Sequence, residues 1–424
     1  MITVLIPAHN ERESIKATVE SVKTQTLQAD RIIVVTDNCS DDTAAIAEGA
    51  GATVMASVDN RGKKAGALNQ ILSRILPEAD DDDIFLVMDA DGRVSPDFLA
   101  IAAGELADSK NGAVGGVFYG KPDKGGLVES MQIAEYVRYA RQVVRKNEQA
   151  YVLTGTATAF TARVLRAVAC GRVDGTLPSG PGAYYDERTM TEDSYMTFAI
   201  KTLGYQTPSP ARCWVSTEVM PTWAMLWRQR RRWQLGALEN LRSFGFWTKV
   251  TWKYSFKQFI AVCELIFFAA YFTSLGMTLA SGTYHVMPFW LAIGGIFWLE
   301  RIVTARKAGP KAMLIASTMV IELAYSFFLK AVNVYSYYQV IRNREIAWLS
   351  GLGKLAEEIA MYGAPTGGIG AGVLGAGTVG SIFVWGDSGW LLMAFFVLAM
   401  ATVAAMTVIP RKRAAMRHVG PPRA

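Results

Sequence analysis

The stretch DIFLVMDAD, residues 83–91, joins an unbroken apolar run to two carboxylates. An apolar run without polar alternation is typical of a strand buried on both faces, as in a parallel sheet covered by helices. Similar runs occur at ITVLIPA (2–8), RIIVVTD (31–37) and TVMAS (53–57), and stretches of helical character separate them at about 11–26, 40–50 and 64–76. This alternation predicts an α/β domain with a Rossmann-like, doubly wound and mostly parallel sheet.

The carboxyl ends of these strands are where such a sheet binds its ligands. They read PAHNE (7–11), TDNCSDDT (36–43) and DADG (89–92). No glycine-rich fingerprint follows a strand, which excludes a typical NAD or FAD site. The one literal match, GAGVLG (370–375), lies in an apolar, glycine-rich segment, and we interpret it as close helix packing. An anionic ligand at this acidic edge would need a cation between it and the protein.

Asp89 and Asp91 are candidates to hold that cation. Two carboxylates at i and i+2 can share one divalent ion whose other ligands are water and substrate phosphates, although such a pair alone can equally be a solvated turn. The run DDDD (80–83) precedes the strand and is expected to be solvated. Four cysteines without a CxxC pair and only three histidines exclude a disulfide framework, a zinc site and a histidine-rich metal site.

The distribution of charge divides the chain of 424 residues, whose formal net charge is +6. No charged residue occurs over 265–299, 359–386 or 388–410. Because a bilayer core takes roughly 20 apolar residues per helix, we expect candidate spans at 258–281, 287–303, 312–338, 367–386 and 389–409. The predicted organisation is a soluble domain (1–220), amphipathic interfacial helices (221–256), a transmembrane domain (257–410) of about four spans, between three and five, and a basic tail (411–424).

The N-terminus has no basic segment followed by a long apolar run, so no signal peptide is expected. Basic stretches at 301–311 and 411–418 are typical of cytoplasmic loops. We therefore expect a multi-pass protein of the cell inner (plasma) membrane whose soluble domain is cytoplasmic.

The segment WRQRRRWQLG (227–236) concentrates four arginines and two tryptophans. Residue types alone allow a nucleic-acid patch, a membrane-surface helix or part of a catalytic site. No nucleic-acid motif accompanies the segment, so nucleic acid is not an expected partner. A second polar segment, RTMTEDSYM (188–196), places Glu192 and Asp193 at the predicted start of a helix, where acidic residues are favourable even without a function.

The order of these motifs is more specific than any one of them. PAHNE (7–11), DAD (89–91), TED (191–193) and QRRRW (229–233) follow one another, with KAGALN (64–69) between the first two. This set resembles the family-2 glycosyltransferases of GT-A fold. It is most similar to their membrane-embedded, processive branch, which includes cellulose, chitin, hyaluronan and poly-N-acetylglucosamine synthases. The resemblance covers residues 2–240 and extends to the membrane part only in outline.

This resemblance implies a reaction and the residues that perform it. Asp91, with Asp89 nearby, would hold Mg²⁺ or Mn²⁺ against the diphosphate of a UDP-sugar, and Lys64 and Arg232 would add positive charge there. Asp193 would be the general base that takes the proton of the acceptor hydroxyl. A single base acting opposite the leaving group implies inversion, so an α-linked donor would give a β-linked product.

The resemblance also implies a set of substrate-binding residues. They are Asp37, Ala8 and Glu11 at the uracil end of the cleft, Glu192 beside the base, and Gln229 and Trp233 on the acceptor side. The indole of Trp233 would offer a flat face to the acceptor sugar. Residues 229, 232 and 233 share one face of a helix, so the remaining arginines at 228, 230 and 231 are expected to meet anionic membrane lipid.

Three departures from the family pattern keep alternatives open. The second strand ends in TDNCSDD where DDGSxDxT is commoner, no membrane helix precedes the catalytic domain, and TGTATAF (154–160) replaces the usual acceptor-side glycine turn. The leading hypothesis is a processive polysaccharide synthase with a carbohydrate acceptor. The second is a single-sugar transferase whose acceptor is a polyprenyl phosphate or another lipid. The third is a membrane receptor or transporter with a degenerate, non-catalytic domain. The motifs do not specify which sugar is transferred.

Overall fold

The computed structural model describes residues 1–122, 125–282, 285–286, 288–342 and 384–385. The described chain forms two units. Of the described residues, the first comprises 1–260 and 297–342, and the second comprises 261–296 and 384–385.

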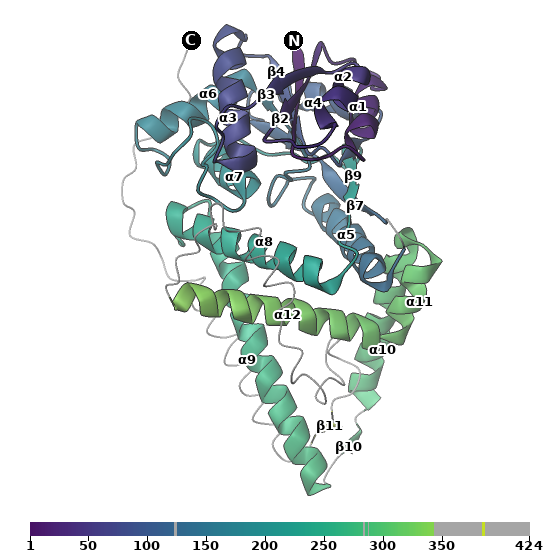
Figure 1. Ribbon diagram of the computed structural model, residues 1–424. Helices are drawn as coiled ribbons and strands as arrows, with labels where there is room; N and C mark the ends of the chain where they lie inside the picture. The colour runs from purple at the N-terminus through teal and green to yellow at the C-terminus, as the bar shows by residue number, and fades with distance from the viewer. Residues whose placement is uncertain (123–124, 283–284, 287, 343–383, 386–424) are drawn as a thin grey trace. The chain divides into compact units, whose positions relative to one another are not determined.

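The main sheet of the first unit has six strands in the order β3-β2-β1-β4-β8-β6 (Figure 1). They are β1 (Ile2–Ala8), β2 (Arg31–Thr36), β3 (Thr53–Ala56), β4 (Ile84–Met88), β6 (Ala113–Gly115) and β8 (Ala157–Thr161). The four strands predicted from apolar runs are all present, and β1 pairs in parallel with β2 and β4. The α/β prediction is therefore confirmed for this unit.

The sheet is mostly parallel, as predicted, and one strand makes it mixed. Strands β1, β2, β3 and β4 pair in parallel, whereas β8 runs antiparallel to both β4 and β6. Its first residue, Ala157, pairs with Met88, the last residue of β4. The turn before β8 therefore lies beside the carboxyl end of β4, and Asp89 donates its backbone N–H to the carbonyl of Thr156 at 3.0 Å.

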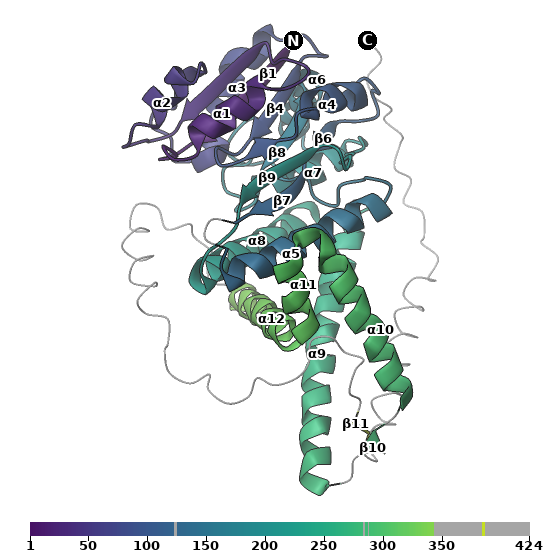
Figure 2. The same cartoon turned by 90° about the vertical axis from the view of Figure 1, so that its right-hand side faces the viewer.

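Helices cover both faces of this sheet, which explains why its central strands β1 and β4 are buried and largely apolar (Figure 2). One face packs against α1 (Ile15–Lys23), α2 (Thr43–Gly49) and α4 (Phe98–Leu106), and the other against α3 (Lys63–Ile75), α6 (Ala162–Val173) and α7 (Glu192–Thr202). Alternate residues of β1 follow this division. Val4 and Ile6 belong to the first core, Leu5 to the second, and none of the three is exposed to solvent. A short 3₁₀ helix, η1 (Leu76–Glu78), follows α3.

A second sheet brings another acidic strand end to the same region. It contains β5 (Arg93–Val94), β9 (Trp214–Glu218) and β7 (Val117–Lys121), with β9 in the centre. Strand β5 begins two residues after Asp91, so its pairing with β9 draws Thr217 and Glu218 towards that carboxylate. Helix α5 (Leu127–Arg145) follows β7.

The arginine-rich segment lies on α8 (Trp223–Phe244), which Thr222 caps by accepting the backbone N–H of Met225. Helix α12 (Val320–Ile341) runs beside α8 (Figure 1). Aromatic rings join the two helices: Trp223 packs on Phe328 with a centroid distance of 4.8 Å, and Trp227 packs on Tyr335 at 5.8 Å. One face of α12 is therefore covered by protein.

The expected span over 312–338 is not one straight helix. Helix α11 (Pro310–Thr318) and α12 meet at an angle of 82°. Met319, between them, has φ of +53°, a left-handed conformation that an α-helix cannot continue through. A 3₁₀ turn, η2 (Arg306–Ala308), precedes α11.

Among the described residues, α9 (Trp252–Ser281) is the single helix long and apolar enough to cross a bilayer, and the bent pair α11–α12 qualifies only if it counts as one span. Helix α9 contains the expected span 258–281, and α10 (Pro288–Ala305) contains nearly all of 287–303. A short strand, β10 (His285–Val286), pairs with β11 (Val384–Trp385). The expected span 389–409, the rest of 367–386, the tail 411–424 and the decoy 370–375 lie outside the described residues. The number of spans stays a prediction.

Candidate active site

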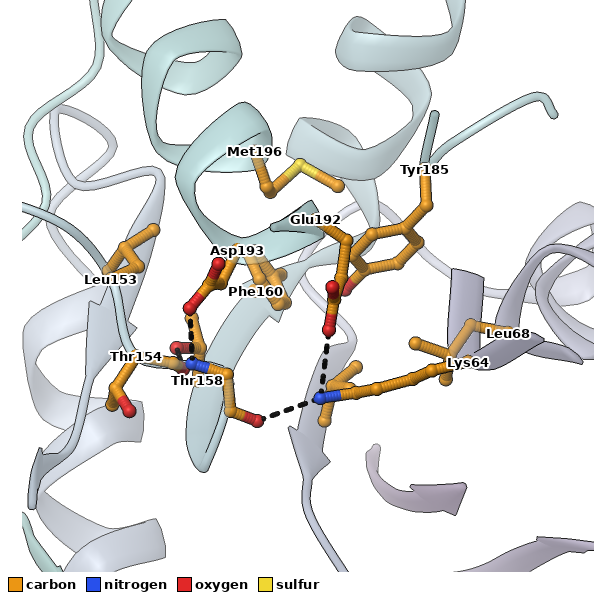
Figure 3. A pocket seen from close by; sticks show the side chains of 12 residues that line it. Lys64, Leu68, Leu153, Thr154, Thr158, Phe160, Tyr185, Glu192, Asp193 and Met196 are labelled. Atoms are coloured by element: carbon orange, nitrogen blue, oxygen red, sulfur yellow. Dashed lines mark hydrogen bonds and ion pairs between the residues drawn. The ribbon is translucent and has the colours of Figure 1, made fainter. Parts of the chain in front are cut away.

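Lys64 occupies the centre of the candidate site. It lies in the first turn of α3, and its Nζ is 3.2 Å from Glu192 Oε1 and 3.1 Å from the carbonyl oxygen of Gly155 (Figure 3). The same Nζ is 2.5 Å from Asp89 Oδ1. Burial lowers the pKa of Lys64, but Asp89 and Glu192 raise it by more, so the net pKa is raised and the ammonium stays charged. The sequence predicted Lys64, Asp89 and Glu192 separately, and the fold brings them into contact.

Asp193 lies on the other side of Gly155. Its Oδ2 accepts the backbone N–H of Gly155 at 3.2 Å, and its Oδ1 accepts that of Ser194 at 2.7 Å. Burial and the neighbouring Glu192 raise the pKa of Asp193 to about 6, while Lys64 acts in the opposite direction. Lys64, Gly155 and Asp193 line a small cavity of about 20 Å³, enough for one water molecule or hydroxyl group (Figure 3).

Glu192 and Asp193 are adjacent in sequence, but their pKa values are shifted in opposite directions. Burial raises the pKa of Glu192, yet Lys64 and Arg232 lower it by more, so the net pKa is lowered. The direct ion pair with Lys64 therefore keeps Glu192 ionised, whereas Asp193 can gain or lose a proton near neutral pH. This arrangement gives the site one fixed charge and one exchangeable proton.

Asp91 lies among carboxylates, and no cationic side chain of the described residues pairs with it. Burial, together with the nearby Asp89, Glu11 and Glu218, raises its pKa to about 7. The hydroxyl of Thr217 donates to Asp91 Oδ2 at 3.3 Å. Binding of a cation stabilises such a cluster, because it compensates the negative charges.

Among the described residues, no group of three or more His, Cys, Asp or Glu side chains is arranged so that it could hold a metal ion. Asp89 and Asp91 still fit the Mg²⁺ or Mn²⁺ expected from the sequence, because Mg²⁺ takes one or two carboxylates and leaves its other positions to water and substrate phosphates. The unpaired negative charge around Asp91 is the feature that fits a divalent ion here.

The residues expected at the uracil end lie at the ends of β1 and β2. Asp37 is buried, and its Oδ1 accepts hydrogen bonds from Ser57 at 2.7 Å and Asn60 at 2.8 Å. Ala8 accepts the backbone N–H of Asp37, which fixes the two strand ends together. Burial raises the pKa of Glu11, the last residue of PAHNE. Asp37 has structural partners here, and its contact with uracil stays a prediction.

Arg232 of α8 lines a cleft of about 390 Å³ together with Lys64 and Glu192. The rest of the lining carries both signs of charge and includes Arg61, Arg188, Glu187 and Glu239. The side-chain oxygen Oε1 of Gln229 is buried without a hydrogen-bond partner in the described structure. A buried acceptor left without a donor costs free energy, so Gln229 is available to a ligand hydroxyl.

The expectation that Arg230 meets lipid is wrong. Only 10% of its side chain is exposed, and its Nη2 is 3.0 Å from Glu135 Oε2 of α5. Tyr325 of α12 donates its hydroxyl to the same carboxylate at 2.5 Å, and the guanidinium lies 4.4 Å from the ring centroid of Trp233. Helix periodicity placed Arg230 away from Gln229, but the partly buried Glu135 supplies a counter-charge on that side. Arg230 therefore holds α5, α8 and α12 together and fixes Trp233.

Sequence reasoning missed the residues that shape the loop before α7. Asn69 of α3 donates to the carbonyl of Tyr185 and to Glu187 Oε1, both at 2.9 Å, and it accepts the backbone N–H of Tyr185 at 2.9 Å. Arg172 of α6 donates to three successive carbonyls, at residues 180, 181 and 182. The only available signal for Asn69 was its position in KAGALN (64–69). No sequence motif pointed to Arg172 or Glu135.

The catalytic domain has relatives among sugar-transferring enzymes. The family model described as Glycosyl transferase family 2 matches residues 3–169. The poly-beta-1,6-N-acetyl-D-glucosamine synthase of Staphylococcus aureus (strain COL) is 29% identical over 276 residues, which are 62% of this chain and 61% of that protein. The chain thus spans less than two thirds of the length of this curated relative.

Two solved structures are similar at lower identity. The mannosyltransferase PcManGT from Pyrobaculum calidifontis, in complex with GDP-Man and Mn²⁺, is 18% identical with a TM-score of 0.49, over 81% of this chain and 88% of that one. The glucosyl-3-phosphoglycerate synthase of Mycobacterium tuberculosis, in complex with Mg²⁺ and UDP, is 19% identical with a TM-score of 0.39, over 59% and 81%.

The family match covers β1 to β8 and includes Lys64, Asp89, Asp91 and Gly155. It agrees with the GT-A fold expected from the motifs, with β8 as the strand that makes the sheet mixed. The family's chemistry, sugar transfer, also agrees with a site that has a fixed cation, a carboxyl of raised pKa and an acidic cluster around Asp91. Residues 3–169 therefore match a glycosyl transferase family 2 domain, and the chain is similar to sugar-polymerising enzymes over 276 residues.

Proposed function

We propose that this protein transfers a sugar from a UDP-sugar to the end of a growing polysaccharide at the cytoplasmic face of the cell inner membrane, with inversion to a β-linkage. The observation that carries this proposal is the carboxyl of Asp193, held by the backbone N–H groups of Gly155 and Ser194 and with a pKa raised to about 6. A base with a pKa just below the working pH is ionised and still takes up a proton effectively.

In this proposal Asp193 removes the proton of the acceptor hydroxyl as that oxygen attacks the anomeric carbon of the donor. Lys64 lies on the other side of Gly155 and carries a permanent positive charge. Together with Arg232 in the adjoining cleft, it stabilises the negative charge that develops on the departing diphosphate. The proposed base, Asp193, and the positive charge of Lys64 thus lie on opposite sides of Gly155, and this arrangement supports in-line displacement.

Asp91 and Asp89 would hold the divalent ion. When bound, Mg²⁺ or Mn²⁺ supplies positive charge to the diphosphate, in addition to that of Lys64 and Arg232. The chain's own part is to keep Asp91 among Asp89, Glu11 and Glu218, where the carboxylate lacks a cation. Asp37, Ala8 and Glu11 would receive the nucleoside, at the ends of β1 and β2.

Gln229 and Trp233 would bind the acceptor. The unpartnered Oε1 of Gln229 suits a sugar hydroxyl, and Trp233 is fixed by Arg230 on α8. The similarity to a poly-N-acetylglucosamine synthase makes UDP-N-acetylglucosamine the first donor to test and a carbohydrate polymer the first product to expect. Helix α9 supports an integral membrane protein, since it is long and apolar enough to span.

The test is to incubate the protein, purified in detergent, with a panel of UDP-sugars and Mg²⁺ or Mn²⁺, and to measure UDP release and product size. A long β-linked product supports the proposal. A single sugar on an added polyprenyl phosphate supports the lipid-acceptor alternative. Binding of UDP-sugars without release of UDP, in the presence of oligosaccharide and lipid acceptors, supports the non-catalytic alternative and contradicts ours.

A further inference from the structure

Four lysines gather around one pair of tyrosines away from the candidate active site. This lysine cluster consists of Lys146 at the end of α5, Lys201 at the end of α7, and Lys253 and Lys257 in the first two turns of α9. The rings of Tyr151 and Tyr254 pack with a centroid distance of 4.1 Å. The Nζ atoms of Lys146 and Lys257 each lie 4.8 Å from the ring centroid of Tyr151.

The lysine cluster lacks an anion. Across the part of the chain that the structure describes, no carboxylate forms an ion pair with any of the four lysines. Lys201 Nζ donates only to neutral groups: the carbonyl of Ala150 at 2.7 Å, the carbonyl of Tyr151 at 3.1 Å and the hydroxyl of Tyr254 at 2.9 Å. Burial, together with the nearby Lys253 and Lys146, lowers the pKa of Lys201 to about 8. A negative ligand would relieve this repulsion.

The chemistry around the cluster is that of a membrane boundary. Lys253 and Lys257 belong to α9, the helix that is long and apolar enough to span. Phe246, Trp247 and Trp252 precede or begin that helix, and their exposed fractions are 44%, 67% and 37%. Exposed aromatic rings next to lysines at the end of an apolar helix are typical of the headgroup region.

We propose that the lysine cluster binds the phosphate group of an anionic phospholipid headgroup. Lysines near an anionic bilayer surface each add favourable binding energy, and a buried lysine whose partners are all neutral gains most from a phosphate oxygen. This site is distinct from the expected lipid contact of α8, where Arg230 is paired with Glu135.

Occupancy of this site is linked to the candidate catalytic base through two contacts. Lys201 holds the carbonyls of Ala150 and Tyr151, in the segment that leads to Gly155, whose N–H binds Asp193. Tyr254 packs against Phe198 of α7, the helix that begins beside Asp193, with a centroid distance of 4.6 Å. A bound headgroup therefore stabilises the backbone that positions Asp193.

The experiment measures thermal stability of the full chain in neutral detergent, so its readout does not depend on sugar transfer. Short-chain phosphatidylglycerol is titrated against the wild type and the double variant Lys146→Gln/Lys257→Gln. Lys249→Gln removes an exposed lysine near the start of α9 that does not contact the tyrosine pair, and serves as the matched control. We expect the phosphatidylglycerol concentration that gives half of the maximal stabilisation to rise roughly 5-fold for each cluster lysine removed. In the control this concentration should stay unchanged.

Three outcomes would overturn the proposal. Equal weakening in Lys249→Gln would mean general surface charge, and the same stabilisation by phosphatidylcholine would mean an apolar effect of lipid tails. Stabilisation by glycerol phosphate or inorganic phosphate at the same concentrations as phosphatidylglycerol would mean a site for soluble phosphate. Because neither variant changes a residue assigned to sugar transfer, UDP release in the absence of anionic lipid reports separately on the proposed function.

Discussion

Two neighbouring groups of carboxylates differ in one respect: among the residues that the structure describes, a cationic side chain lies in only one of them. The lysine-centred group consists of Asp89, Glu192 and Asp193 around Lys64. The cation-free group consists of Asp91, Glu11 and Glu218, and burial raises the pKa values of Asp91 and Glu11. Residues of the same chemical type therefore behave differently according to what lies within ion-pair distance.

This difference separates two tasks of the proposed reaction. In the lysine-centred group the protein supplies the positive charge, so Glu192 stays ionised and Asp193 can exchange a proton. In the cation-free group the protein supplies only negative charge, so the positive charge has to come with the substrate as a metal ion. Removing a member of each group should then cause different losses.

The largest loss is expected for Asp91→Asn in the cation-free group. Loss of a charged ligand should reduce UDP release by about 10⁴-fold, since a catalytic metal supplies several kcal/mol of charge stabilisation. Mn²⁺ should raise the melting temperature of the wild type but not that of the variant. Asp82→Asn, at the other end of β4, is the control and should remain active. Activity of Asp91→Asn that also survives EDTA would refute the metal site.

Asp193→Asn in the lysine-centred group is expected to lower kcat by about 10²–10⁴-fold, the range for loss of a general base. UDP-sugar affinity should stay nearly unchanged, because the base acts only on the acceptor proton. Single-turnover kinetics combined with equilibrium binding of UDP separates the two effects. A variant that loses nucleotide binding instead would show that Asp193 is not the base.

Arg230 offers a further test of whether a paired charge matters more than an unpaired one. Arg230→Ala leaves Glu135 without its cation and Trp233 without its stacked guanidinium, and breaking such a pair costs on the order of 3 kcal/mol. We expect about a 100-fold lower kcat/KM for elongation, which corresponds to that energy. Arg231→Ala, the neighbouring control, should change it less than about threefold. Equal losses would restore the interpretation of a uniformly basic membrane helix.

The smallest expected effect is the pH dependence of Asp193. As the base, its carboxyl must be ionised, so kcat should fall about tenfold per pH unit below pH 6. Stability should change in the opposite direction, because the folded-state pKa lies above the unfolded value of 3.8 and the native state binds the extra proton. Relative to Asp193→Asn, the wild type should lose stability as pH rises from 4 to 8, by up to about 3 kcal/mol. Denaturant titrations without ligand at pH 4, 6 and 8 check this sign.

The parts of the fold that could be predicted from the sequence depend on local patterns. Strands at 2–8, 31–37 and 83–91 were visible because a strand buried on both faces is largely apolar. The edge strand at 53–57 is partly exposed, and it was visible from its place in the alternation of apolar runs and helical stretches. The direction of β8 was not visible, since an antiparallel and a parallel buried strand have the same composition. The break at Met319 was also hidden, because the residues around it are all compatible with a continuous helix.

For the candidate site, too, some features could be predicted from the sequence and others could not. Motif order identified Lys64, Asp89, Asp91 and Asp193, but their roles still rest on the proposed function. The burial of Arg230 could not be inferred, because Glu135 is 95 residues away in sequence. The same holds for the loop held by Asn69, whose partners lie 116 residues or more away.

The sequence by itself determined which chemical groups stand at the strand ends, because backbone hydrogen bonding and apolar patterning are local and leave the polar residues at the carboxyl edge. Only the tertiary structure decided which of those groups have a counter-ion. Lys64 meets Asp89 and Glu192 because α3, β4 and α7 converge on Gly155, while no cationic side chain in the described part of the chain pairs with Asp91. The charge state of a buried group depends on distances of a few ångströms between segments remote in sequence, and those distances are set by packing.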